Sequence, residues 1–335
     1  MCDLSGLLIY LLLILLLSFS IIVKNHIYIL ILTMFISVII ASLRGDSGVD
    51  SFLYILRFEH LELSGPLPLI EPIIPSIMWI AKSLGGSFEL FSFFYGIILA
   101  VLYYYIFRRF PNAIYFGLAI FPVIFIDSLF NGIRVGLAYP LVILSIAYSS
   151  GLILFIALST HVSSLMAAPF KIIPIKYLLI LFVLFVIAVK LNNTAIFDFM
   201  PERYVSKFNA YQNLATPNPY GGIADTSALF VSIFIYLRIL GYRGYNLAIR
   251  IFPIFLLLVV YQIFFVVKFT FLLRVTRVLV VIVFGLIAKS RIGIDKVALY
   301  ASFTFGVLYS ANFIRQIIST CSYAEGGFLP LNLGG

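Results

Sequence analysis

The sequence feature that most constrains the fold is a series of continuously apolar segments, each about 15 to 20 residues long, the length that crosses a bilayer core. Because the runs are continuous and do not alternate with polar residues, they favour helices over a membrane barrel. The sequence therefore predicts an all-α polytopic membrane protein with about ten transmembrane helices, at residues 6–23, 27–43, 88–107, 112–127, 133–149, 177–190, 225–242, 251–267, 270–288 and 297–313.

The amino-acid composition supports this class. Of the 335 residues, 63% are hydrophobic and only 10% are charged, a balance that excludes an ordinary soluble domain.

The first apolar run, residues 6–23, lacks a preceding basic region and a small-residue cleavage pattern, so we interpret it as a retained helix. We expect residues 1–335 to form a single integral membrane domain. Cys2 and Cys321 match no metal or redox spacing, and we predict neither a metal nor a cofactor.

The basic residues predict the orientation of the chain. The net charge of +9 comes mainly from lysines and arginines in short loops, which is typical of the cytoplasmic side of a membrane protein and argues against nucleic-acid binding. This rule places two long polar segments, 44–87 and 191–224, on the outer side as large loops. Every acidic residue except Asp295 is then outside. The loops assigned to the cytoplasm contain Lys24 and His26, Arg108 and Arg109, Lys171 and Lys176, Arg238 to Arg250, and Lys289 to Lys296.

The segment 151–170 does not fit this alternation, because the basic loops on both sides of it are assigned to the same face. Small polar residues surround His161 in the middle of this apolar run. Irregular backbone at membrane depth is tolerated only where protein or water covers it. We therefore predict a broken or re-entrant helix near His161, a residue that is a candidate base, core hydrogen-bonding residue or ligand.

The first outer loop gathers charge that its flanking segments lack. Asp50 opens a segment with helical periodicity, in which Asp50, Tyr54 and Arg57 share the polar stripe. This pattern indicates a helix at the membrane surface. Glu71 follows in a proline-broken, mostly apolar stretch at the bilayer edge.

Three arginines lie within apolar runs, where a charged side chain costs about 2.5 to 3.5 kcal/mol. Arg274 and Arg277 share one helical face, and Arg134 begins another helix on the outer side. The alternative is that they reach the headgroups as simple membrane anchors. For Arg134 alone the two interpretations are equal, whereas the pair 274 and 277 favours a functional role.

Outward-facing arginines beside outward-facing carboxylates match the chemistry of a lipid-linked pyrophosphate, because arginine holds phosphate in a bidentate fork. Cleaving a sugar from such a lipid requires stabilisation of the developing pyrophosphate charge and a base for the incoming hydroxyl. The pyrophosphate-binding role suits Arg44, Arg134, Arg274 and Arg277, with Tyr54 as a further substrate-binding residue. The catalytic role suits Asp50, Glu71 or His161, with Asp50 favoured.

Residues 40–170 resemble the EpsG family of exopolysaccharide proteins, which includes Wzy-type O-antigen polymerases. The motifs that carry the resemblance are, in chain order, an arginine followed by Gly-x-Asp and Tyr, a Glu-Pro pair before Gly-Ser-Phe, Asn-x-x-Arg, and His-x-Ser. They correspond to Arg44, Gly48, Asp50 and Tyr54, then Glu71, Pro72, Gly86, Ser87 and Phe88, then Asn131 and Arg134, and finally His161 and Ser163.

The resemblance implies a glycosyltransferase that joins undecaprenyl-pyrophosphate-linked oligosaccharide repeat units at the periplasmic face of the bacterial inner membrane. Its expected partners are these oligosaccharides, membrane lipid and a chain-length regulator protein. Two alternatives remain open. One is another polyprenyl-linked transferase or ligase, and the other is a flippase or transporter in which the same arginines line a pathway for anionic lipid.

Overall fold

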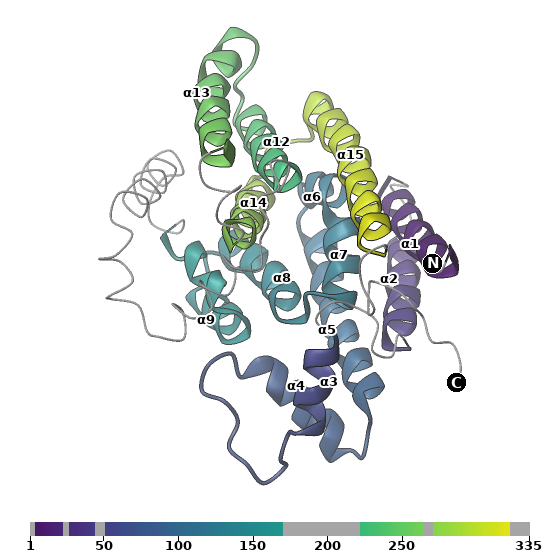
Figure 1. Ribbon diagram of the computed structural model, residues 1–335. Coiled ribbons are helices and arrows are strands. Elements are labelled where there is room, and N and C mark those ends of the chain that lie inside the picture. Colours follow the sequence, from purple (N-terminus) through teal and green to yellow (C-terminus); the bar gives the residue numbers. More distant parts are fainter. Residues whose placement is uncertain (1–3, 23–26, 44–50, 170–221, 264–270, 322–335) are drawn as a thin grey trace.

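A computed structural model describes residues 4–22, 27–43, 51–169, 222–263 and 271–321, and in these ranges the regular structure is helical (Figure 1). The α-helices are α1 (Leu4–Ile22), α2 (Ile27–Ser42), α3 (Ser51–Glu59), α4 (Ile73–Ser83), α5 (Phe88–Arg109), α6 (Ala113–Ala119), α7 (Phe121–Phe130), α8 (Ile133–Ala147), α9 (Gly151–Thr160), α12 (Ile223–Ile239), α13 (Tyr245–Tyr261), α14 (Phe271–Lys289) and α15 (Lys296–Cys321), and the 3-10 helix η1 spans Val162–Ala167.

The helix α8 lies at the centre of the bundle. It packs against α5, α7, α9 and α14, and nearly every residue from Gly136 to Ile146 is buried. The core beside it is aromatic, because the rings of Tyr103, Phe116, Phe121 and Phe125 stack or meet edge to face. These rings come from α5, α6 and α7, which the aromatic core holds together.

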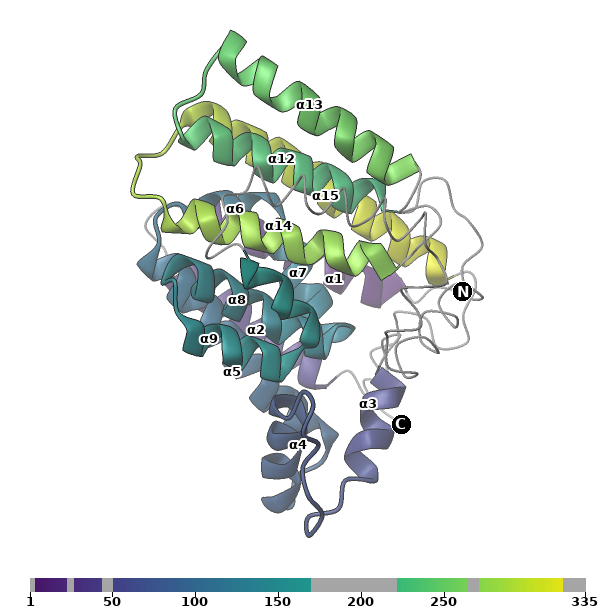
Figure 2. The ribbon, with the colours of Figure 1, turned by 90° about the vertical axis from the view of Figure 1, so that its left-hand side faces the viewer.

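The C-terminal helices form a second group on one side of this core. Figure 2 shows α12, α13, α14 and α15 running side by side. α12 packs on both α14 and α15, whereas α13 is the outermost member and packs mainly on α12. Both groups meet along α8 and α14, so residues far apart in sequence face each other there.

The described helices fit a polytopic membrane protein, although the predicted total of about ten spans is not confirmed. By length and hydropathy, two helices in the described ranges are able to cross a membrane, Phe88–Arg109 and Lys296–Gln316. The pair α6 and α7 would be a third, bent by 69°. The predicted segment 177–190 and most of the predicted outer loop 191–224 lie outside the described residues.

The bend between α6 and α7 was not predicted, since the sequence pattern indicated one segment over residues 112–127. Ile120 ends α6 with a backbone outside the helical region, and Pro122 stands in the first turn of α7. Proline lacks an N–H donor, so it is compatible with a helix start and not with a continuous helix.

The prediction of an interrupted helix near His161 is confirmed. α9 ends at Thr160, His161 is extended with φ −155° and ψ 129°, and η1 follows directly. The side chain of Ser150 caps the start of α9 by accepting the N–H of Ile153. The interruption turns His161 away from a continuous helix axis and toward other elements.

The short helix predicted after Asp50 is also present as α3, but its orientation differs from the predicted one. Tyr54, assigned to a polar stripe, is buried with 4% of its surface exposed, whereas the apolar Leu53 is 55% exposed. Periodicity could not distinguish these faces, because Phe58 and neighbouring apolar residues pack inward with Tyr54.

Four connections lie together at one end of the bundle, as expected for segments that the sequence assigned to one side of the membrane. We call this end the basic end, and it consists of residues 110–112, 148–150, 240–244 and 290–295. The side-chain amide of Asn112 donates to the carbonyls of Ser290 and Ile292, at 2.8 and 3.0 Å. Lys289 donates to Ser149, and Arg238 pairs with Asp295. The left side of Figure 2 shows the connections α12–α13 and α14–α15 together.

The packing of α15 on α6 depends on a glycine. A Cβ atom added to Gly306 would collide with the backbone carbonyl of Leu118, which cannot rotate aside as a side chain could. We expect Gly306→Ala to destabilise the protein by about 1–3 kcal/mol through overpacking. Gly151→Ala is the matched control, because nothing lies within 4 Å of that Cβ position. Thermal unfolding of the two purified variants in detergent checks this, and equal unfolding temperatures would contradict the close contact.

Candidate functional site

The loop that carries Glu71 is anchored between α3 and α4. The ammonium group of Lys82, in α4, donates to the carbonyls of Phe58, Glu59 and Leu61 at 2.9, 2.7 and 2.8 Å. These are carbonyls at the end of α3, which a helix itself leaves without partners. The indole of Trp79 holds the carbonyl of Leu63 in the same way, at 3.1 Å.

Glu71 occupies an unusual backbone conformation just before α4. Its φ angle is +56°, and among the described non-glycine residues only Ser149 also has a positive φ. A non-glycine residue in this region costs about 1–3 kcal/mol and persists where surrounding contacts determine it, often at functional sites. The conformation places the carboxylate against α8 and η1.

The Glu71 carboxylate is the centre of a group of side chains that we call the Glu71 cluster: Tyr54, Glu71, Arg134 and His161. Arg134 Nη1 donates to Glu71 Oε2 at 2.9 Å, and the backbone N–H of Val162 donates to Oε1 at 3.1 Å. His161 Nε2 lies 3.9 Å from Oε1, and Arg134 Nε donates to the Tyr54 hydroxyl at 3.4 Å. The start of α8 and the break between α9 and η1 therefore meet at one carboxylate, and α3 joins the cluster through Arg134.

The contacts of His161 favour one tautomer of its ring. The backbone N–H of Ser163 donates to His161 Nδ1 at 3.2 Å, and the Ser163 hydroxyl lies 2.6 Å from the same atom. A nitrogen that accepts a backbone N–H carries no proton, so the neutral ring has its proton on Nε2, the atom nearest Glu71. In this state His161 can donate a proton toward Glu71 but cannot accept one there.

The same contacts set the ionisation of Glu71. Burial raises the pKa of the Glu71 carboxyl, but the Val162 N–H, His161 and Arg134 together outweigh burial, so the pKa lies below its ordinary value of 4.5. Glu71 is therefore ionised at neutral pH. Because its pKa is lowered in the folded protein, its contribution to stability is present at neutral pH and is lost as the pH falls through the folded value.

An open pocket of about 530 Å³ lies beside the Glu71 cluster. Tyr54, Glu71 and Arg134 line it, together with α3, the proline-rich loop and the start of α4. Only 13% of the Glu71 side chain and 25% of the Arg134 side chain are exposed, so both are partly shielded from water yet accessible from the pocket. The pocket lies at the start of α8, about 20 Å along the helix axis from its end near the basic end.

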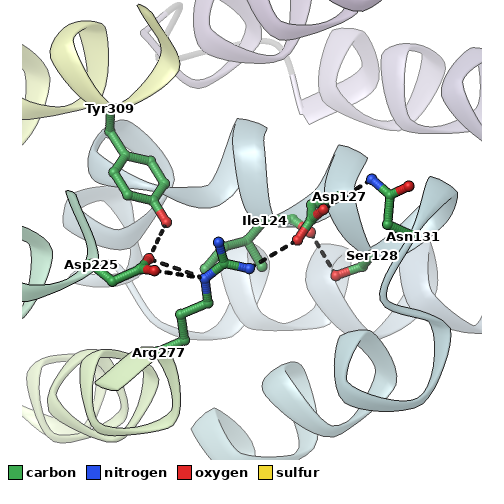
Figure 3. Close-up of polar contacts among 7 residues, drawn as sticks. All are labelled: Ile124, Asp127, Ser128, Asn131, Asp225, Arg277 and Tyr309. Atoms are coloured by element: carbon green, nitrogen blue, oxygen red, sulfur yellow. Dashed lines mark hydrogen bonds and ion pairs between the residues drawn. The ribbon is translucent and has the colours of Figure 1, made fainter. Parts of the chain in front are cut away.

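A second polar group, the Arg277 cluster, lies inside the bundle and consists of Asp127, Asp225, Arg277 and Tyr309 (Figure 3). Arg277 Nε lies 3.0 and 3.1 Å from the two carboxylate oxygens of Asp225, and Nη1 lies 3.2 Å from Asp127 Oδ2. The Tyr309 hydroxyl donates to Asp225 Oδ1 at 2.8 Å. The cluster therefore ties together α7, α12, α14 and α15.

The turn between α7 and α8 connects the two clusters. Asn131 Nδ2 donates to Asp127 Oδ1 at 3.1 Å, and the carbonyl of Asp127 accepts the N–H groups of Asn131 and Gly132. Asn131 is buried, and its side-chain oxygen has no hydrogen-bond partner among the described residues. Arg134 follows within one turn of α8, so the Arg277 cluster supports the backbone that presents Arg134.

The structure thus brings together Tyr54, Glu71, Arg134 and His161, which were predicted as site residues from sequence, and it places Arg277 in a separate cluster. Arg44 and Asp50 lie outside the described residues, as does the side chain of Arg274 in the first turn of α14. Asp127, Asp225 and Tyr309 were missed. The signal for Asp127 and Asp225 was present, since both are carboxylates at the edges of apolar runs, but the predicted orientation had counted them as residues of the outer surface.

A bundle of apolar helices with charged clusters inside it and a polar pocket at one end fits the class of polytopic membrane proteins. The chain belongs to the EpsG family, whose family model matches residues 26–333, and this is a Wzy-like polymerase family. Membership suggests a polysaccharide polymerase-like function. No curated protein and no solved structure matches the chain.

Proposed function

We propose that this protein is a polysaccharide polymerase that joins undecaprenyl-pyrophosphate-linked oligosaccharide repeat units, and that the Glu71 cluster is its reaction site. The observation that carries the proposal is the Glu71–Arg134 contact of 2.9 Å at the wall of an open pocket. It places an ionised carboxylate beside a permanent cation, at the end of the bundle opposite the basic end. Family membership supports the same reaction class.

In the proposed reaction, a hydroxyl of the acceptor sugar attacks the anomeric carbon of the donor unit, and the bond from that carbon to the pyrophosphate oxygen breaks. Glu71 takes the proton of the attacking hydroxyl, because it is ionised and exposed to the pocket. His161, with its proton on Nε2, orients the carboxylate and is not the base. Asp50, favoured by the sequence, remains a rival for the same role and lies outside the described residues.

Arg134 stabilises the leaving polyprenyl pyrophosphate. Nη1 and Nε contact Glu71 and Tyr54, so the two N–H groups of Nη2 remain for a phosphate oxygen. A preorganised cation aimed at a developing negative charge lowers the barrier without reorganisation of water. Arg44 and Arg274 are proposed as further pyrophosphate ligands on the strength of the sequence.

For Arg277 the geometry favours a different role from the predicted one. Two carboxylates around one guanidinium leave the Arg277 cluster with a formal charge of −1 when both aspartates are ionised. Negative charge repels pyrophosphate, so the cluster is a poor site for that anion. We therefore propose that Arg277 holds α7, α12 and α14 together and supports the turn before Arg134.

Reconstitution tests the proposed function. Purified protein in liposomes, supplied with one defined undecaprenyl-pyrophosphate-linked repeat unit, should yield a ladder of products that differ by one unit, with release of undecaprenyl pyrophosphate. A flippase would move a fluorescent lipid-linked unit across the bilayer without forming a ladder. A ligase would add a unit only to a different acceptor molecule. Either outcome would overturn the assignment as a polymerase.

The proposed periplasmic face of the pocket gives a topological prediction. After replacement of Cys2 and Cys321 by serine, a cysteine at the exposed Ser64 should react with an impermeant thiol reagent added outside spheroplasts. A cysteine at Arg291, at the basic end, should react only after permeabilisation. The reverse pattern of labelling would place the pocket on the cytoplasmic side and remove the basis for a periplasmic reaction.

A further inference from the structure

A second pocket, at the basic end, has no role in the proposed reaction. Its volume is about 690 Å³, and it lies where α5, α8 and α14 end. Three of its lining residues are cationic: Arg109, Lys289 and Arg291. Two aromatic side chains, Phe110 and Tyr148, form part of the same wall and meet edge to face with their ring centroids 5.2 Å apart.

Hydrogen bonds between elements hold the walls of this basic pocket in place. Asn112, which is 2% exposed, lines the pocket and fixes the carbonyls of Ser290 and Ile292. Lys289 donates to the Ser149 hydroxyl at 2.8 Å, which ties the end of α14 to the α8–α9 connection. The excess of lysine and arginine in cytoplasmic loops does not require such hydrogen bonds, because flexible side chains in water have the same charge.

The charge of the basic pocket is not neutralised by the protein. Among the described residues, no carboxylate lies within ion-pair distance of Arg109, Lys289 or Arg291. The acidic residue nearest in sequence, Asp295, is already engaged: Arg238 donates to it at 3.1 Å, and the N–H of Ala298 at 2.9 Å. A pocket with three unmatched cations favours an anionic occupant.

We propose that the basic pocket binds the phosphate-bearing headgroup of an anionic phospholipid. Phosphate accepts several charge-assisted hydrogen bonds from arginine and lysine. The pocket lies at the ends of three apolar helices, the level at which headgroups meet a spanning bundle and at which aromatic side chains such as Tyr148 are enriched. The occupant bridges α5 and α14, and it thereby stabilises the end of the bundle opposite the Glu71 cluster.

Two adjacent arginines provide a matched experiment. Arg109 lines the basic pocket, whereas Arg108 is also exposed but points elsewhere, donating to the Tyr104 hydroxyl at 2.8 Å. Wild type, Arg108→Gln, Arg109→Gln and Arg291→Gln are reconstituted in nanodiscs of phosphatidylcholine with increasing phosphatidylglycerol. Thermal unfolding and native mass spectrometry then report stabilisation and retained lipid, and neither measurement requires polymerase activity. Failure of this proposal is therefore distinguishable from failure of the proposed function.

We expect phosphatidylglycerol to raise the unfolding temperature of wild type and Arg108→Gln and to be retained by both. Arg109→Gln and Arg291→Gln should each bind it roughly five- to tenfold more weakly, as expected for the loss of one charge-assisted contact. Equal loss in Arg108→Gln would indicate diffuse surface charge and would overturn the proposal. Equal stabilisation by free inorganic phosphate or pyrophosphate, without lipid, would assign the pocket to a soluble anion instead.

Discussion

Arg277→Met is expected to destabilise the protein by about 3 kcal/mol, because it removes the only cation that contacts Asp225 among the described residues and leaves that buried carboxylate with the Tyr309 hydroxyl but no charge partner there. Asp225 is 7% exposed at its side chain, so water cannot replace the lost partner. The value is at the low end of the range for broken buried pairs, since 34% of the Arg277 side chain is exposed. Thermal unfolding in detergent measures the effect.

Two further variants identify the cause. Arg315→Met removes an exposed arginine that donates to Asn312 on the same helix, α15, and it should unfold close to wild type. The combined variant Arg277→Met, Asp225→Asn and Asp127→Asn removes the uncompensated charges, and it should recover much of the lost stability. If Arg277→Met unfolded at the same temperature as Arg315→Met, the Arg277 cluster would not hold the helices together.

Glu71→Gln is expected to lower the rate of polymerisation by about 10²- to 10⁴-fold, the usual contribution of a general base. The amide keeps the size of the side chain, but its single oxygen can accept from only one of the two donors, Arg134 Nη1 or the Val162 N–H, so substrate binding is measured separately from the rate. Initial rates with a defined lipid-linked unit, measured beside a binding assay, separate the catalytic step from binding.

Glu59→Gln is the matched control for Glu71→Gln. Glu59 is an exposed carboxylate on α3, close in the chain but not part of the pocket wall, and its loss should leave the rate unchanged. If Glu71 only positioned Arg134, Glu71→Gln would retain most activity and Glu71→Ala would not. In the wild type, the lowered pKa of Glu71 predicts that the midpoint of the acid-side decline in rate lies below the ordinary carboxyl pKa of 4.5.

The Glu71 cluster was predictable from the sequence to a large extent, since three of its four members, Glu71, Arg134 and His161, broke the pattern around them. Glu71 lies in a proline-rich stretch, His161 interrupts an apolar run, and Arg134 is a charge at a helix start. Such residues are costly in an apolar environment, so they are visible without a structure. Their mutual contact was not visible, because it depends on how α3, α4 and α8 meet η1.

The Arg277 cluster was largely missed for a different physical reason. Asp127 and Asp225 fall at the edges of apolar runs, where the sequence pattern predicts that a carboxylate lies at the surface. Tyr309 is one of 21 tyrosines, and nothing in the sequence distinguishes it from the others. Only the packing of α12 on α14 and α15, and of α14 on α8, shows that these carboxylates face Arg277 inside the bundle. Similarly, the orientation of Tyr54 was ambiguous, because protein interior and lipid both favour apolar side chains.

The most direct test of the central claim is to locate the bound substrate by photo-crosslinking. An undecaprenyl-pyrophosphate-linked unit with a photoreactive group beside the pyrophosphate is bound to the reconstituted protein, irradiated, and mapped by mass spectrometry. We expect labelling of peptides that line the pocket of the Glu71 cluster, between Tyr54 and Met78 or around Arg134, and its loss in Arg134→Gln. Labelling confined to the basic pocket, around Arg109 and Lys289, would contradict the assignment of the reaction site.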